Sequence, residues 1–375
     1  MEKLKVLVLF NTAGPPPPNQ DYSRDLEAGV KQAEYDVFAA LLERGHEARL
    51  LGIHSDVQVL FDGVQAWKPD VVFNACEAFR RQSAMEMNIA ALLELLGLPY
   101  TGSPPSALLL ARDKVLAKKI LTFHRVRVPR FAVVPLGAPL EGPIGVRYPL
   151  IVKPAAEDGS RGIAQASVVR DRDALEARVR FVHQSLSQDA LVEELIEGRE
   201  LYLGLLGNPD PTPLPLIEMT FEKIPEAKPR IASYRAKWDP KYRERHGIQN
   251  VFPSDLAPEV VHRIEDVGRT AYRALHLRDY ARIDVRLTPE GEIYVLEANP
   301  NPYLAFGEDM SDAAERAGMP YPEFVSRIVE LASERRGRGA NAEAPARAAA
   351  ARAVALAAAQ ESARPGGSGS GGAVN

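Results

Sequence analysis

Short apolar runs that alternate with amphipathic segments occupy the first hundred residues. Residues 4–10 (LKVLVLF), 48–53 and 71–74 form short apolar runs of the kind that make buried β-strands. Between the first two runs, apolar side chains recur at helical spacing, at Val30, Ala33, Val37, Ala40 and Leu41, before Gly45. A further helix over 89–96 ends at Gly97. Strands that alternate with helices in this way predict a parallel, doubly wound sheet.

The rest of the chain predicts helices and short strands in a different arrangement. A helix over 105–123 is followed by predicted strands at 130–134, 150–154, 163–169 and 190–196, with a helix at 172–186 between the last two. This pattern predicts a small α+β module with an antiparallel sheet. Residues 197–335 add more strands, a long charged loop over 221–252 and two amphipathic helices, with apolar faces at Val260, Ile264, Val267, Ala271 and Leu275 and at Phe324, Ile328 and Leu331.

These patterns divide the chain into an α/β part, two α+β parts and a tail. The Pro/Gly/Ser-rich residues 99–106 mark the first boundary. We expect domains at 1–104, 105–190 and 191–336. Residues 337–375 are Ala/Arg-rich and then Gly/Ser-rich, a composition that buries too little apolar surface to offset ordering entropy and predicts a disordered tail.

Composition narrows the class of protein. The chain has 375 residues, with 46 Lys and Arg against 50 Asp and Glu, and nucleic-acid binding would need a basic excess. The single cysteine, Cys76, excludes a disulfide framework and a cysteine-based zinc site. The apolar run Val6–Phe10 is too short for a membrane span or a signal peptide. We therefore expect a cytoplasmic protein that binds neither nucleic acid nor membranes.

The most informative stretch is residues 281–302, ARIDVRLTPEGEIYVLEANPNP, which predicts two strands joined at Glu290-Gly291. Closing the hairpin there places Asp284 opposite Glu297, Arg282 opposite Asn299, and Arg286 opposite Val295. Side chains that oppose each other, or lie two apart, share a face of the sheet. One face therefore gathers Arg282, Asp284, Glu297 and Asn299. The other gathers an apolar set that faces the core, Ile283, Val285, Leu287, Tyr294, Leu296 and Ala298.

Two interpretations of the polar face are open at this point. Asp and Glu oxygens together with an Asn carbonyl suit Mg²⁺, which shares its remaining positions with water and phosphates. The simpler interpretation is a solvated edge hairpin in which Arg282 and Arg286 neutralise Asp284 and Glu297. The ending EANPNP favours the metal site, because an Asn followed by prolines ends the hydrogen bonding between the two strands and leaves polar groups at the open end of the hairpin.

Residues 150–162, LIVKPAAEDGSRG, form a second motif. A buried strand delivers Lys153, and a loop with Gly159, Ser160 and Gly162 follows it. Glycine-rich backbone lets N–H groups approach phosphate oxygens, and a lysine at a strand end supplies positive charge. Taken alone the motif is weak, because a Lys-Pro pair often simply ends a strand.

Residues 191–201, LVEELIEGREL, form a third motif, a strand that runs into a turn at Gly198. Glu193 and Glu200 are candidates to accept hydrogen bonds from an adenine amino group and ribose hydroxyls. The backbone of Leu195 and Ile196 would then pair with the ring edge. An ordinary acidic turn is the simpler interpretation. Lys114 and Lys237 likewise look like solvated surface lysines when each is considered alone.

Taken together and in this order, the motifs resemble the ATP-grasp superfamily, and most closely D-alanine–D-alanine ligase and its relatives. The similarity extends over about residues 1–335. Its most specific segments are LLELLGLPYTGS (92–103), the helix with Asp113-Lys114, IVKP (151–154), EELIEGREL (193–201), and RIDVR with LEANPNP. The resemblance implies an ATP site between two antiparallel sheets. It also implies an ATP-dependent ligase that activates a carboxylate as an acyl phosphate and joins it to an amine.

The resemblance also implies roles for individual residues. Asp284, Glu297 and Asn299 would hold two Mg²⁺ ions, with Mn²⁺ as an alternative. Lys114, Lys153 and Lys237 would contact phosphates. Adenosine would be held by Glu193, Leu195, Ile196 and Glu200. Ser160 would lie in the loop that closes over the phosphates, and Arg282 would stabilise the charge that develops on the acyl phosphate and the tetrahedral intermediate.

The substrate side departs from the family pattern. Residues 303–310 (YLAFGEDM) are acidic where a serine-containing segment would bind a carboxylate, and NACEAF replaces a histidine motif after the third strand. Within that replacement, Glu77 is a candidate to bind an amine. The substrates are expected to be amino acids or a peptide, of unassigned identity, and a homodimer is left open. A catalytically silent ATP-binding module and an ATP-grasp kinase are the alternative functions.

Overall fold

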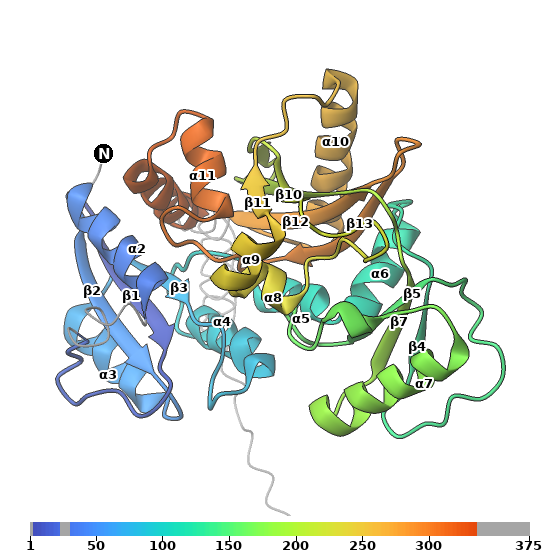
Figure 1. The fold of residues 1–375 in the computed structure, drawn as a ribbon. Coiled ribbons are helices and arrows are strands. Elements are labelled where there is room, and N and C mark those ends of the chain that lie inside the picture. The colour runs from blue at the N-terminus through green and yellow to red at the C-terminus, as the bar shows by residue number, and fades with distance from the viewer. Residues whose placement is uncertain (1–2, 23–30, 336–375) are drawn as a thin grey trace, which may run out of the picture. The chain divides into compact units, whose positions relative to one another are not determined.

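The computed structural model describes residues 3–22 and 31–335. It begins with three parallel strands in the order β2-β1-β3, namely β1 (Lys5–Asn11), β2 (Glu47–Ile53) and β3 (Val71–Ala75). The apolar side of α2 (Gln32–Glu43) packs on Val6 and Val8 of β1, whereas α3 (Gln58–Trp67) and α4 (Glu86–Leu95) pack against Leu7 and Leu9. Helices thus cover both faces (Figure 1), and the doubly wound sheet is confirmed.

Two helices, α5 (Pro105–Arg112) and α6 (Lys114–Phe123), replace the single helix predicted over 105–123. The break is at Asp113, whose backbone is extended. Its carboxylate accepts hydrogen bonds from the N–H groups of Val115 and Leu116, at 3.1 and 2.9 Å. An aspartate that caps a new helix ends the previous one, because its backbone is no longer helical. This break lets Lys114 begin a new helix.

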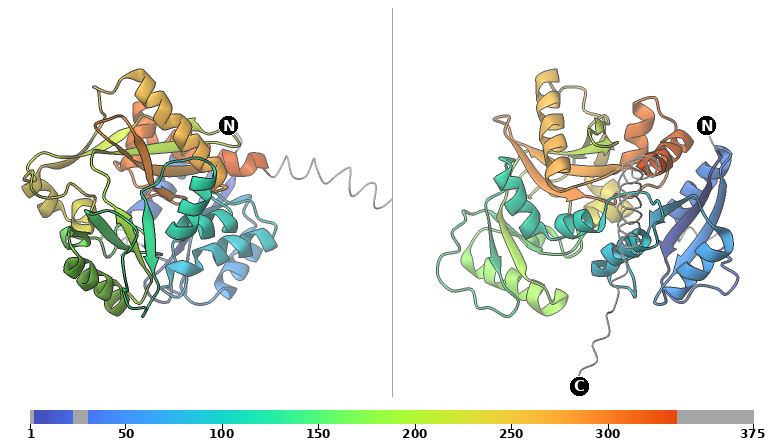
Figure 2. Two further views of the ribbon diagram at one scale, coloured as in Figure 1. Left: turned by 90° about the vertical axis from the view of Figure 1, so that its right-hand side faces the viewer. Right: turned by 180° about the vertical axis from the view of Figure 1, so that it is seen from behind.

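A four-stranded antiparallel sheet follows, in the order β4-β7-β5-β6. Its strands are β4 (Phe131–Val134), β5 (Leu150–Pro154), β6 (Val168–Val169) and β7 (Ala190–Glu194). Helix α7 (Arg172–Phe181) covers one face of this sheet (Figure 2), through Leu175 and Val179. A π-helical turn over Val182–Leu186 follows it. The strand predicted at 163–169 shrinks to two residues, because Ile163 turns back to donate to the Ser160 carbonyl and Gln165–Ser167 form a 3₁₀ turn.

The last sheet is antiparallel, in the order β11-β10-β8-β12-β13, with β9 paired to β8. The strands are β8 (Arg199–Leu206), β9 (Thr212–Pro213), β10 (Ile217–Phe221), β11 (Ile248–Val251), β12 (Tyr280–Leu287) and β13 (Ile293–Asn299). Helices α5, α6 and α10 (Pro258–Ala274) cover one face. Helix α11 (Asp309–Arg316) and the helical residues 321–332 pack on the other.

The segment 221–252, predicted as a charged loop, contains two short helices, α8 (Tyr234–Trp238) and α9 (Pro240–His246), and the strand β11. The loop prediction was wrong because two local caps start these helices. The Ser233 hydroxyl accepts from the Ala236 N–H at 3.3 Å, and the Asp239 carboxylate accepts from the Tyr242 N–H at 3.0 Å. The cap at Ser233 places Lys237 on a helix.

The β12–β13 hairpin confirms the predicted pairs Asp284 with Glu297 and Arg282 with Asn299. Beyond them the register shifts by one residue, so that Arg286 lies opposite Tyr294 and not opposite Val295. The cause is a β-bulge, in which Leu296 is the extra residue and lines a pocket next to Glu297. Val295 takes the place in the core that the sequence had suggested for Leu296.

The described residues up to Ala332 form one compact unit, so the domain boundaries at 104 and 190 stay predictions. The tail predicted at 337–375 lies outside the described residues, as does Val30. Within residues 3–22 and 31–335, no helix has the length and apolar character needed to cross a membrane.

Candidate active site

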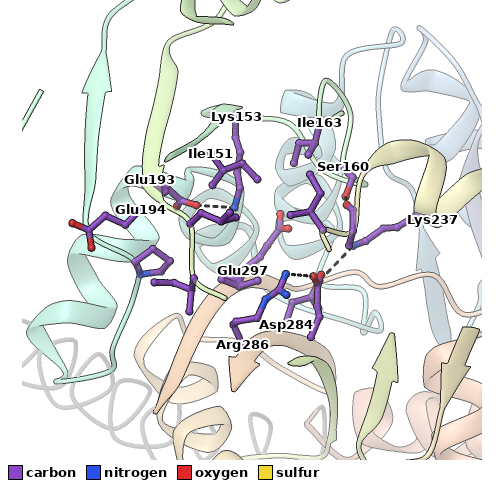
Figure 3. Close-up of a pocket in the computed structure, with 17 residues that line it drawn as sticks. Ile151, Lys153, Ser160, Ile163, Glu193, Glu194, Lys237, Asp284, Arg286 and Glu297 are labelled. Carbon is purple, nitrogen blue, oxygen red and sulfur yellow. Dashed lines mark hydrogen bonds and ion pairs between the residues drawn. The ribbon is translucent and has the colours of Figure 1, made fainter. Parts of the chain in front are cut away.

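A pocket lies between the four-stranded and the six-stranded sheets, with walls formed by β5, β7, β12, β13 and the segment before α8 (Figure 3). We call it the inter-sheet pocket. Nine of the twelve residues expected at the site line it: Lys153, Ser160, Glu193, Leu195, Ile196, Glu200, Lys237, Asp284 and Glu297. The other three, Lys114, Arg282 and Asn299, contact Glu297 or Asp284 directly. The fold therefore brings the predicted residues to one place.

Lys114 pairs with one of the two hairpin carboxylates. It is buried at the start of α6 and forms an ion pair with Glu297, while its second partner, Asp158, is 3.4 Å away. Burial lowers the pKa of Lys114, but the two carboxylates outweigh it and raise the pKa overall. Burial likewise opposes ionisation of Glu297, yet Lys114 lowers its pKa to about 2. The pair is therefore charged on both sides at neutral pH.

Glu193 lies at the centre of a buried group with two lysines. Its carboxylate oxygens lie 2.7 Å from the ammonium groups of Lys118 and Lys153 (Figure 3 shows the contact with Lys153). Lys118 also donates to the carbonyl of Leu296, the bulge residue, at 3.1 Å. Sequence reasoning missed Lys118. The available signal was its position one turn after Lys114 on the same face of α6.

Asp284 is held by three neighbours from different elements. Arg282 donates two hydrogen bonds to its carboxylate, at 2.8 and 3.1 Å, and the ammonium of Lys237 lies 3.5 Å away. The amide of Asn299 donates to it at 3.1 Å. Asp309, another residue that sequence reasoning did not assign, accepts from the opposite side of the Arg282 guanidinium at 3.2 Å. Arg282 is therefore fixed between two aspartates.

Glu200 and the β7–β8 turn form another part of the pocket wall, next to Arg286. Glu200 is buried and forms an ion pair with Arg286. The N–H of Leu195 donates to the Pro149 carbonyl at 2.9 Å. The carbonyl of Leu195 is then the backbone group of this residue that can bind a ligand. Arg286 thus neutralises Glu200 and not Glu297, because the two residues lie directly opposite each other on β12 and β8.

The loop with Ser160 is tied to the segment before α8. The Ser160 hydroxyl donates to the Ala232 carbonyl at 2.7 Å, and the indole N–H of Trp238 donates to the Gly159 carbonyl at 2.9 Å. The inter-sheet pocket encloses about 60 Å³ in this state, room for only a few water molecules. The two hydrogen bonds hold the loop against the segment before α8, at the wall of this pocket.

The hairpin carboxylates suit a hard divalent cation. Asp284, Glu297 and Asn299 lie in register at the open end of β12 and β13, and each carboxylate is already neutralised by lysine or arginine in the structure. Oxygen donors are what Mg²⁺ prefers. The described residues contain no group of three or more His, Cys, Asp or Glu side chains arranged for a metal. The set therefore depends on the Asn299 amide and on oxygens that a ligand supplies.

A second cavity of about 200 Å³ lies at the carboxyl ends of β1 and β3, and we call it the Lys31 cavity. Its polar lining includes Asn11, Lys31, Glu34, Glu77 and Asn301. Lys31 pairs with Glu34 and donates to the Asn11 carbonyl, both at 2.8 Å. The order β2-β1-β3 reverses between these strand ends, where open α/β sheets usually bind ligands.

Glu86 lies behind the Lys31 cavity and accepts a hydrogen bond from Asn301 at 3.1 Å. Burial raises its pKa from 4.5 to about 7, although the bond from Asn301 lowers it. The folded state therefore binds this proton more tightly than the unfolded chain does, and the resulting stabilisation is lost as pH rises from about 4.5 through about 7. We expect Glu86→Gln to remove this loss. Urea unfolding at about pH 5 and about pH 8 should show a smaller fall in midpoint for the variant than for wild type, and equal falls would contradict the assignment.

The fold and the site define an ATP-grasp protein, with two antiparallel sheets that face each other across lysines and carboxylates. Two crystal structures of D-alanine–D-alanine ligase from Bacillus anthracis, one complexed with ATP, match with a TM-score of 0.68 and 20% and 19% identity. Each match covers 90% of this chain, and 99% and 100% of the respective ligase chains. These likenesses confirm the expected fold.

Sequence comparisons identify the family. The family model for the D-Ala–D-Ala ligase C-terminus matches residues 143–330. The D-alanine–D-alanine ligase of Desulforudis audaxviator is 33% identical over 307 residues, which cover 80% of this chain and 92% of the relative. An uncharacterised protein, y4sG, from Sinorhizobium fredii is also 33% identical, over 80% of this chain and 87% of that protein. This chain belongs to the D-alanine–D-alanine ligase family, and the expected enzyme class, a ligase, is confirmed.

Proposed function

We propose that the protein is an ATP-dependent ligase that joins the carboxylate of one amino acid to the amine of another amino acid or a peptide. The observation that carries the proposal is the arrangement in the inter-sheet pocket, where Lys114, Lys153 and Lys237 accompany Asp284 and Glu297 between the two sheets. Phosphoryl transfer needs positive charge and positioning more than a side-chain nucleophile. The pocket supplies both.

In this proposal the nucleotide lies along the inter-sheet pocket. The three lysines contact its phosphates, and the loop with Ser160 closes over them after releasing the Ala232 carbonyl. Glu200 and the backbone of Leu195 and Ile196 hold the adenosine. Glu193 acts differently from the expectation, since its carboxylate is already shared by Lys118 and Lys153. Its role is to orient Lys153 toward the phosphates.

Asp284, Glu297 and Asn299 would hold Mg²⁺. When bound, the ion neutralises phosphate oxygens during transfer. Lys114 and Lys237 already contact these carboxylates and would remain beside the phosphates. Mn²⁺, which also takes oxygen ligands, is the alternative ion.

The chemistry consists of two substitutions. A substrate carboxylate oxygen attacks the γ-phosphorus of ATP, which releases ADP and forms an acyl phosphate. The amine of the second substrate then attacks the acyl carbon, loses a proton and expels phosphate. Arg282 is partly buried and held between Asp284 and Asp309. The positive charge of its guanidinium stabilises the negative charge on the tetrahedral intermediate.

The Lys31 cavity supports an amino acid as the first substrate. At about 200 Å³ it suits a small molecule, and Lys31 with Glu34 and Glu77 offers charges of both signs to a zwitterion. Burial, followed by the negative charge of Glu34, raises the pKa of Glu77, and an ammonium group would offset that repulsion. The family relatives are named for D-alanine. We therefore propose a small amino acid at this cavity, and an enzyme that acts in the cytoplasm.

The experiment that tests the proposal measures ADP release with Mg²⁺ across a panel of D- and L-amino acids and short peptides. Hydroxylamine is added in a parallel series, since it traps an acyl phosphate as a hydroxamate. We expect ADP release that depends on one amino acid and a hydroxamate of that acid. Tight ATP binding without turnover on any carboxylate would instead identify a silent ATP-binding module, and a stable phosphorylated alcohol would identify a kinase.

A further inference from the structure

Arg286 is a buried guanidinium in the wall of the inter-sheet pocket that the reaction above does not use (Figure 3). It is 4% exposed, on β12 two residues after Asp284. One terminal nitrogen donates to a Glu200 carboxylate oxygen at 2.5 Å. The other donates to the carbonyls of Gly198 and Arg230, at 2.9 and 3.1 Å. Its Nε has no hydrogen-bond partner among the described residues.

These contacts join three segments that line one end of the pocket. Glu200 is the second residue of β8, and Gly198 lies in the turn that carries Leu195 and Ile196. Arg230 precedes Ile231 and Ala232, which also line the pocket. A planar guanidinium can donate in several fixed directions at once, so one side chain sets the positions of all three segments. A lysine has no such geometry.

The contact with Arg286 also determines which part of Glu200 is available. Arg286 donates to one carboxylate oxygen of Glu200. The other oxygen accepts a long hydrogen bond of 3.4 Å from the Tyr202 hydroxyl. That second oxygen retains lone pairs for hydroxyl donors. Without Arg286, the buried carboxylate of Glu200 would lose the ion pair that the described residues give it, and its side chain would be expected to turn toward another cation.

We propose that Arg286 is a positioning residue for nucleotide recognition, which fixes Glu200 so that its free oxygen accepts from the ribose hydroxyls. The inference rests on the proposed nucleotide site but not on the identity of the amino-acid substrates. It predicts that replacing Arg286 weakens the binding of a nucleotide with both ribose hydroxyls, and weakens less the binding of a nucleotide that lacks one of them.

The test compares binding of ATP and 2′-deoxy-ATP, by calorimetry with Mg²⁺ and without amino acids, to the full-length protein and to Arg286→Met and Arg286→Lys. We expect wild type to prefer ATP. In Arg286→Met, ATP should bind roughly tenfold to a hundredfold more weakly, because a hydrogen bond to a charged group is misaligned. Binding of 2′-deoxy-ATP should change less, so that the preference shrinks. Arg286→Lys should restore part of it.

Arg199→Met is the matched control. Arg199 precedes Glu200 on β8 and also pairs with carboxylates, those of Glu218 and Asp255, but it does not line the inter-sheet pocket. We expect this variant to keep the wild-type preference for ATP. If Arg286→Met does not fold, Arg286→Lys provides the comparison, with a smaller change in the same direction.

Three outcomes would overturn the inference. Equal weakening for the two nucleotides in the Arg286 variants would mean that Arg286 only maintains the structure. Unchanged ATP binding in a folded Arg286 variant, or a wild type that does not distinguish the nucleotides, would also overturn it while leaving the ligase proposal intact. Conversely, a preference that depends on Arg286, in a protein without turnover on any carboxylate, would refute the ligase and support this inference.

Discussion

Glu297→Gln is expected to abolish most turnover while the protein stays folded. The substitution keeps the size of the side chain but removes the charge that faces Asp284 across the hairpin and pairs with Lys114. An amide cannot offset the charge of a divalent cation, and it also leaves the buried ammonium of Lys114 with only Asp158 at 3.4 Å. We expect kcat for ADP release to fall by roughly a hundredfold to a thousandfold, the usual size for one lost electrostatic contact at a reacting phosphate.

A matched control is Glu290→Gln, an exposed position in the turn of the same hairpin. Its turnover and its dependence on Mg²⁺ concentration should equal those of wild type. The circular dichroism spectrum of Glu297→Gln should also match wild type, which separates lost chemistry from lost folding. Near-normal turnover in Glu297→Gln would refute the metal and phosphate roles of this residue.

Sequence reasoning predicted the pairs at the open end of the hairpin, Asp284 with Glu297 and Arg282 with Asn299, and these are the pairs of the structure. The pairs next to the turn are shifted by one residue from the prediction, so the open end has the predicted register only because the bulge adds one residue to β13. The bulge at Leu296 was not predictable in the same way. It is stabilised by a contact from another element, the hydrogen bond from Lys118 to the Leu296 carbonyl.

The residues that sequence reasoning missed share one property: their roles depend on partners far away along the chain. Lys118 meets Glu193, Arg286 meets Glu200, and Asp309 meets Arg282. Local motifs carry no information on such pairs, whereas the lysine of IVKP and the acidic residues of LEANPNP lie within segments that are recognisable by themselves. The helices α8 and α9 were missed for a different reason, since their caps outweigh a charged composition.

Lys118→Met is expected to lower the stability of the protein more than any surface change. Lys118 and Glu193 are almost fully buried, and the ammonium of Lys118 joins α6 to β7 and to the bulge in β13. Burial lowers the pKa of Lys118, and Glu193 opposes that effect, so the lysine depends on its partner for its charge. Lys118→Met removes the ion pair with Glu193 and the hydrogen bond to the Leu296 carbonyl, and leaves Lys153 as the remaining cation beside Glu193. Because hydrogen bonds of a charged group are lost, we expect the free energy of unfolding to fall by about 3 kcal/mol. Urea unfolding at neutral pH measures it.

The neighbouring Lys119→Met provides the control, because Lys119 lies exposed on the same helix and its loss should change the free energy of unfolding by less than about 0.5 kcal/mol. A double-mutant cycle with Glu193→Gln then isolates the pair. If the cost of Lys118→Met comes from the lost ion pair with Glu193, the same substitution in a Glu193→Gln background should cost clearly less. Equal costs in both backgrounds would mean that Lys118 stabilises the protein through its contact with Leu296 alone. In that case Glu193 would act only on Lys153. The Lys153–Glu193 ion pair and the Lys118–Leu296 hydrogen bond would then be two independent contacts.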